Sequence, residues 1–145
     1  MAGPLKATPA ARNPSAERAR ERDPRRILVV DDEPAIRRIV SRLLTESGYD
    51  VHEASNGAEA LAIVQAAPDL LDLVVSDIIM PHLNGIELLE SLVSVCPGLP
   101  CILITGFAPD ELTARGLTAP CGVLTKPLRE DTFLAEVRRC LGQRH

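Results

Sequence analysis

The chain has 145 residues, of which 46% are hydrophobic, and its formal net charge at pH 7 is −4. This length predicts one folded domain, and its core must be aliphatic because only Tyr49, Phe107 and Phe133 are aromatic. No apolar run approaches the roughly 20 residues that cross a bilayer, and the N-terminus lacks the apolar segment of a secretory signal, so we expect a cytoplasmic protein without a membrane partner.

The first residues differ in composition from the rest of the chain. Residues 1–26 hold seven Lys/Arg and three Asp/Glu residues, whereas residues 27–145 hold nine and seventeen. Four prolines and the lack of apolar periodicity predict a disordered basic Pro/Arg/Ala-rich arm or linker over 1–25, followed by a folded domain over 26–142. The acidic charge of the folded part argues against nucleic acid as a direct partner.

From residue 26 onward, apolar runs typical of strands alternate five times with helical patterns. The strands are expected at 26–31, 50–54, 72–77, 100–105 and 120–125. The helices are expected at 34–47 with Gly48 as its C-cap, between Asn56-Gly57 and Pro68, and at 85–94, 109–117 and 129–141. The pattern over 109–117 is the weakest of the five helices.

This alternation predicts an α/β fold of the flavodoxin-like, doubly wound (βα)5 type, with helices on both faces of a parallel five-stranded sheet. The runs at 26–31, 72–77 and 100–105 are almost continuously apolar, as expected of strands that are covered on both faces. The common strand order is 2-1-3-4-5, which opens a crevice between the first and third strands.

Residues suited to phosphoryl chemistry stand at the ends of four of these strands. Asp31 and Asp32 end the first, Asp77 the third, Thr105 the fourth and Lys126 the fifth. Crowded carboxylates repel one another, and hard oxygen ligands favour Mg²⁺. Asp77 would attack the phosphorus of an incoming phosphoryl group beside the metal, while Lys126 and Thr105 would contact its remaining oxygens.

Each of these residues also has a purely structural interpretation. Asp32 precedes Glu33-Pro34 and would serve as a helix N-cap, and Asp77 would suit a turn. A threonine at a strand end and a solvated lysine before a proline are common. Their joint occurrence at the ends of the right strands favours a functional set.

With these residues, the chain resembles the receiver domain of two-component response regulators over about residues 26–142. The matching segments are ILVVDDEP (27–34), SDIIMPHLNGIELL (76–89), LITG (103–106) and LTKPL (124–128). The combination is specific, whereas the Asp-Asp pair or the Lys-Pro pair alone would be weak.

The resemblance implies a role for each residue of the set. Asp77 would be the phosphoacceptor, and Asp31 and Asp32 would bind Mg²⁺ together with Asp77 and the backbone carbonyl of Ile79. Thr105 would be the switch hydroxyl. Lys126 would bind the phosphoryl group, and its bond to Pro127 would be cis.

The resemblance also implies the partners. A histidine kinase or a histidine phosphotransfer domain would supply the phosphoryl group, and a downstream protein that the sequence does not identify would read the switch. A homodimer through the fourth helix, fifth strand and fifth helix fits the same family. The chain would catalyse only its own phosphorylation and dephosphorylation.

We expect no output domain after residue 142 in this chain. We therefore expect either a single-domain regulator that acts by binding a partner or the C-terminal receiver of a hybrid sensor kinase. The arm at 1–25 favours the second arrangement.

The chain departs from the family pattern at three positions. Val123 stands where receivers usually carry an aromatic residue, three positions before the lysine, so we expect a muted coupling between Thr105 and the rest of the domain. Ile79 and Phe107 would flank the phosphoryl group where polar residues are common. Because neither side chain holds a water molecule, we expect slow self-dephosphorylation.

Other classes share parts of this pattern. An FMN-binding flavodoxin-like protein needs a phosphate loop after the first strand, where this chain has Asp31-Asp32-Glu33-Pro34. A Mg²⁺-dependent aspartyl-phosphate phosphatase needs a second acid soon after the nucleophile, where this chain has Ile78-Ile79. A phosphorylation-independent interaction module does not need the intact acidic set.

The four cysteines show no Cys-x-x-Cys spacing and lie among apolar neighbours. They are Cys96, Cys101, Cys121 and Cys140. We expect four small buried thiols in a reducing cytoplasm.

Overall fold

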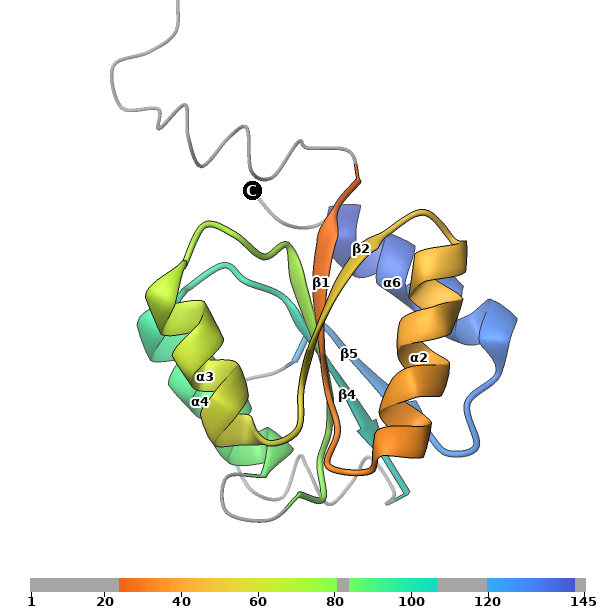
Figure 1. Cartoon of the computed structure of the whole chain (residues 1–145), viewed down its shortest axis with the longest axis horizontal. Coiled ribbons are helices and arrows are strands. Elements are labelled where there is room, and N and C mark those ends of the chain that lie inside the picture. The colour runs from red at the N-terminus through yellow and green to blue at the C-terminus, as the bar shows by residue number, and fades with distance from the viewer. Residues whose placement is uncertain (1–23, 81–83, 107–119, 143–145) are drawn as a thin grey trace, which may run out of the picture.

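The computed structural model describes residues 24–80, 84–106 and 120–142 (Figure 1). Its strands are β1 (Arg26–Val30), β2 (Asp50–Ala54), β3 (Leu73–Asp77), β4 (Cys101–Thr105) and β5 (Gly122–Thr125). Its helices within the described ranges are α2 (Pro34–Glu46), α3 (Gly57–Ala66), α4 (Gly85–Val95) and α6 (Glu130–Gly142). The helix expected at 109–117 and nearly all of the arm expected at 1–25 lie outside the described residues.

The five strands form one parallel sheet in the order β2-β1-β3-β4-β5. This confirms the predicted doubly wound α/β fold and its strand order. Every residue of β3 and β4 is buried, whereas β2 and β5 are partly exposed at the two edges of the sheet. The continuous apolar runs therefore mark the strands that are covered on both faces.

Two hydrophobic clusters fill the two faces of the sheet, because successive side chains of a strand point to opposite sides. Leu28 and Val30 of β1 pack with residues of α3 and α4, whereas Ile27 and Val29 pack with residues of α2 and α6. Figure 1 shows these two helix pairs on either side of the sheet. The largest fully buried side chain is Phe133 of α6.

The helix ends follow local sequence signals. Asn56 caps α3, and Asn84 forms a capping box with Glu87 at the start of α4. The N-cap of α2 is Glu33, which makes no side-chain capping bond, so the interpretation of Asp32 as the cap is wrong. Pro34 begins this helix, and its fixed φ accounts for the start without a cap. The C-cap of α2 is Ser47, so the expectation of Gly48 as the cap is wrong by one residue; Gly48 follows it with a φ of 97°, a conformation that favours glycine.

A close approach joins the end of β3 to the start of α4. A Cβ atom on Gly85 would lie 2.8 Å from the Cα of Ile78, and the Gly85 amide donates to the Ile78 carbonyl at 2.9 Å. Glycine is therefore required for the helix to begin this close to the strand that carries Asp77.

The prediction of four free thiols is wrong for two of them. Cys121, just before β5, forms a disulfide with Cys140 of α6, and their Cα atoms are 6.0 Å apart. Cys96 and Cys101 are free and buried, as expected. The pairing depends on how α6 packs over β5, which a separation of 19 residues does not reveal.

The helices in the described ranges include none that is both long enough and apolar enough to cross a membrane.

Candidate metal centre

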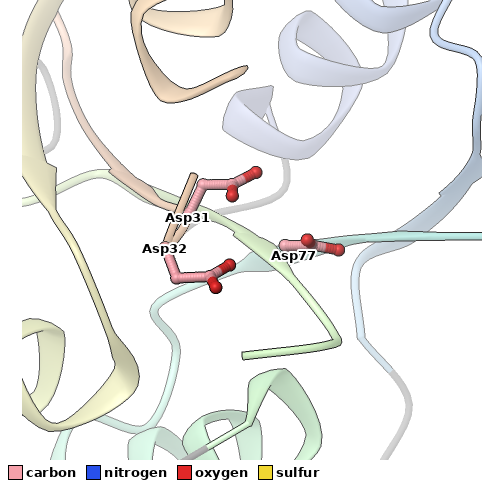
Figure 2. Close-up of side chains that lie close together, drawn as sticks. All are labelled: Asp31, Asp32 and Asp77. Atoms are coloured by element: carbon pink, nitrogen blue, oxygen red, sulfur yellow. The ribbon is translucent and has the colours of Figure 1, made fainter. Parts of the chain in front are cut away.

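The topology of the sheet brings three carboxylates together. β1 and β3 are parallel neighbours, and Val30 pairs with Ser76 in their register. Asp31 and Asp32 follow the last residue of β1, and Asp77 is the last residue of β3. One oxygen from each carboxylate lies within 4.8 Å of those of the other two. Figure 2 shows Asp31 and Asp32 extending from the end of β1 toward the side on which Asp77 lies.

The three carboxylates differ in their exposure. Asp31 is 4% exposed and Asp77 is 7% exposed, whereas Asp32 lies at the surface. Burial raises the pKa of the Asp31 carboxyl, and the Glu33 backbone amide, which donates to Asp31 Oδ1 at 2.9 Å, lowers it. The charge of Asp77 adds to the increase. Two buried acids and one exposed acid form a strongly negative site that is open on one side.

This donor set fits a small hard cation. Carboxylate oxygens without a histidine or cysteine ligand are typical of Mg²⁺, which keeps several waters and takes one or two carboxylates. A cation would also relieve the repulsion that disfavours ionisation of Asp31. The residues present therefore fit the metal that the sequence predicts.

Lys126 and Thr105 approach the same site from the neighbouring strand ends. Lys126 Nζ lies 3.3 Å from Asp77 Oδ2, and the Lys126 amide donates to the Thr105 carbonyl at 2.9 Å. Thr105 is buried at the end of β4. The Lys126–Pro127 bond is cis, as predicted. The structure thus gathers Asp31, Asp32, Asp77 and Lys126 at one end of the sheet, with Thr105 on the strand between Asp77 and Lys126.

The remaining predicted residues have different outcomes. The Ile79 side chain is 60% exposed beside the site, and the role of its carbonyl as a ligand stays a prediction. Val123 packs against the cluster beneath α3 and α4. Phe107 lies outside the described residues.

Sequence reasoning missed two polar groups at this end of the sheet. Arg37 of α2 donates from Nη1 to the Asp31 carbonyl at 2.8 Å and from Nε to Glu53 Oε1 at 3.0 Å. The buried Ser76 hydroxyl donates to the Asp77 carbonyl at 2.9 Å. The only signal for Arg37 is its place one turn after the acidic pair. Its partner Glu53 is on β2, so the contact appears only in the fold.

A family model described as the response regulator receiver domain matches residues 27–138. The chain is 38% identical over 117 residues to the sensor kinase CckA of Brucella abortus, covering 79% of this chain and 12% of the relative. It is 39% identical over 121 residues to the response regulator MprA of Mycolicibacterium vanbaalenii, covering 81% of this chain and 51% of the relative. The chain thus spans about half or less of the length of these curated relatives.

Solved structures share the fold. The chemotaxis protein CheY4 of Vibrio cholerae superposes with a TM-score of 0.71 at 32% identity, covering 80% of this chain and 98% of that chain.

Proposed function

Since the chain belongs to the response regulator receiver domain family, we propose that its Asp77 accepts a phosphoryl group with the help of Mg²⁺. The observation that carries this proposal is the gathering of Asp31, Asp32 and Asp77 within 4.8 Å, with Lys126 Nζ 3.3 Å from Asp77. The phosphoryl donor would be a phosphohistidine of a histidine kinase or of a histidine phosphotransfer domain.

Asp77 acts as the nucleophile in this proposal. One of its oxygens attacks the phosphorus, the bond from phosphorus to the donor nitrogen breaks, and an acyl phosphate forms on Asp77. A bound Mg²⁺ supplies positive charge that offsets the charges of the phosphoryl oxygens and of the carboxylates. Asp31, Asp32, Asp77 and the Ile79 carbonyl would hold it.

Lys126 and Thr105 would stabilise the product. The Lys126 ammonium is already paired with Asp77 and would contact an oxygen of the phosphoryl group after transfer. The Thr105 hydroxyl would turn toward another phosphoryl oxygen and so report phosphorylation to the residues that follow β4. The main-chain bond between Lys126 and Thr105 keeps the two strand ends together during this change.

The wider context follows from the family. We propose that the domain spans residues 26–142, works in the cytoplasm, and catalyses only its own phosphorylation and dephosphorylation. It passes the signal to a protein partner, and β5 and α6 form part of a face through which two copies pair. The sensor kinase CckA among the relatives supports a hybrid-kinase receiver, and the 98% coverage of the CheY4 chain supports a single-domain regulator.

Intact-mass spectrometry after incubation with acetyl phosphate and Mg²⁺ tests this function. We expect one adduct of about 80 Da, the mass of a phosphoryl group, on the wild-type protein and none on the Asp77→Asn variant. Asp131→Asn removes an exposed carboxylate of α6 and should be labelled like the wild type. Equal labelling of wild type and Asp77→Asn contradicts the assignment.

A further inference from the structure

Arg37 links three elements around the acidic site. It lies in the first turn of α2, it binds the Asp31 carbonyl in the turn after β1, and it binds Glu53 near the end of β2. Its side chain is 19% exposed, and its bond to the Asp31 carbonyl is partly buried, whereas its bond to Glu53 is exposed. A planar guanidinium is suited to hold two acceptors in fixed directions.

The turn after β1 has a physical reason to move. Asp31, Asp32 and Asp77 repel one another without a cation, and the two that lie on this turn would relax outward from Asp77. The Asp31 amide is tied to the Ala54 carbonyl at 3.2 Å. Arg37 Nη1 donates a hydrogen bond to the carbonyl of the same residue at 2.8 Å. The turn is therefore held at both main-chain groups of Asp31.

We propose that Arg37 is a positioning residue that keeps Asp31 and Asp32 in the geometry that Mg²⁺ binding requires. This inference rests on the proposed function. Arg37 acts through the Asp31 carbonyl, to which its guanidinium donates directly, and the pairing with Glu53 orients the guanidinium. Groups that orient metal ligands commonly change metal affinity by about 10-fold to 100-fold when they are removed.

Magnesium titration of purified variants by calorimetry tests this role. Arg37→Gln should weaken Mg²⁺ binding by about tenfold. Arg42→Gln is the matched control, because Arg42 is on the same helix, is 78% exposed and pairs with Glu46. It should bind Mg²⁺ like the wild type. Glu53→Gln leaves the bond to Asp31 and removes the charge partner, so its loss of affinity should be smaller.

A merely structural role would give a different result. If Arg37 only stabilises the fold, Arg37→Gln should have a lower melting temperature without metal and the same Mg²⁺ affinity as the wild type. This result would overturn the inference. If Arg37→Gln does not fold, Arg37→Lys keeps the charge but has a single donor nitrogen in place of the two that bind Glu53 and Asp31. It too should bind Mg²⁺ more weakly, and wild-type affinity in that variant would equally overturn the inference. A wild-type protein that binds no Mg²⁺ refutes the proposed function instead.

A separate observation concerns the opposite ends of the strands. The Cys121–Cys140 disulfide ties the start of β5 to α6. Cys140 is fully buried, whereas Cys121 is partly exposed and lines a cavity of about 340 Å³. Arg139 donates from Nη2 to the Cys121 carbonyl, and the same nitrogen lies 3.6 Å from Cys140 Sγ. The Arg139 guanidinium also pairs with Glu136, with Nη2 2.9 Å from Oε2, and a cation beside a sulfur favours its thiolate form.

We infer that this disulfide is a thiol–disulfide exchange site for a low-molecular-weight thiol. A thiolate attacks Cys121 Sγ from the exposed side, the sulfur–sulfur bond breaks, and the electron pair leaves on Cys140 Sγ beside Arg139. A second thiolate then attacks the mixed disulfide. Both protein cysteines are thereby reduced, and the two small thiols become one disulfide. In a cytoplasmic protein such a bond is typically reversible.

Equilibration in mixtures of reduced and oxidised glutathione, followed by acid quenching, alkylation and peptide mapping, tests this site. Cys121 and Cys140 should become alkylated together as the reduced fraction rises, and the free Cys96 and Cys101 serve as internal references. Arg139→Gln should need a ratio of reduced to oxidised glutathione about tenfold higher than the wild type for half reduction of the disulfide. The neighbouring Arg138→Gln should need the same ratio as the wild type. A disulfide that stays intact in excess reduced glutathione, or equal titration of wild type and Arg139→Gln, overturns the inference.

Discussion

Replacement of Gly85 by alanine perturbs the junction between the phosphoacceptor strand and α4. The atom nearest to the new Cβ would be the Asp77 carbonyl oxygen, and the Ile78 Cα would lie 2.8 Å away, whereas ordinary van der Waals contact begins at 3.4 Å. The helix start and the strand end must therefore separate by more than about 0.6 Å. Both clashing groups are backbone, so no side chain can rotate away to relieve the contact.

The magnitude follows from three contributions. Forcing an extra methyl group into a packed site typically costs about 1–3 kcal/mol. Weakening the hydrogen bond from the Gly85 amide to the Ile78 carbonyl adds about 1 kcal/mol. The reduced entropy of the unfolded alanine chain offsets about 0.4–1 kcal/mol. We expect Gly85→Ala to lower the free energy of unfolding by about 1–3 kcal/mol.

Urea unfolding followed by circular dichroism measures this change. Gly142→Ala is the control, because a Cβ at Gly142 has no neighbour within 4 Å. It should be neutral or slightly stabilising. Gly85→Ala should also be labelled more slowly by acetyl phosphate, since the shift displaces the segment next to Asp77. If Gly85→Ala is as stable as the wild type, the close approach of α4 to β3 is not a constraint and the reasoning is refuted.

Three further predictions concern the site. Burial raises the pKa of Asp31 above its ordinary 3.8, so ionisation of this carboxyl lowers the stability of the fold as pH rises from about 4 through the raised pKa. In metal-free thermal melts, Asp31→Asn should therefore be more stable than the wild type at pH 7. This difference in stability should vanish toward pH 4. Lys126→Ala should leave Mg²⁺ affinity nearly unchanged in calorimetry but slow phosphorylation; an equally large loss of affinity contradicts its role. Ile79→Asn should shorten the acyl-phosphate lifetime severalfold in mass-spectrometric time courses, because asparagine can hold the attacking water; an unchanged lifetime contradicts the expectation that the apolar Ile79 slows dephosphorylation.

The sequence was sufficient to predict the fold and the acidic site because one property, the parallel sheet, controls both. Apolar runs that end in Asp31, Asp77 and Thr105 predict strands, and parallel strands bring their carboxyl ends to one edge. Observed element boundaries differ from the predicted ones by a few residues at most, as at α2, which ends at Glu46 instead of 47.

Contacts between elements that are distant along the chain were not predictable in this way. Arg37 meets Glu53 only because α2 packs beside β2, and Cys121 meets Cys140 only because α6 lies over β5. Asp32 does not cap α2, because Pro34 makes a side-chain cap unnecessary. For the Arg37–Glu53 and Cys121–Cys140 contacts, the deciding information is a distance between elements, which periodicity and spacing do not contain.

Chemical trapping of the acyl phosphate tests the central claim most directly. Borohydride reduces an aspartyl phosphate to homoserine, which marks the phosphorylated residue in a peptide map. After incubation with acetyl phosphate and Mg²⁺, we expect homoserine at position 77, and we expect Asp31 and Asp32 to remain aspartate. Homoserine at another position, or none in protein that carries the phosphoryl mass, would contradict the assignment of Asp77 as the phosphoacceptor.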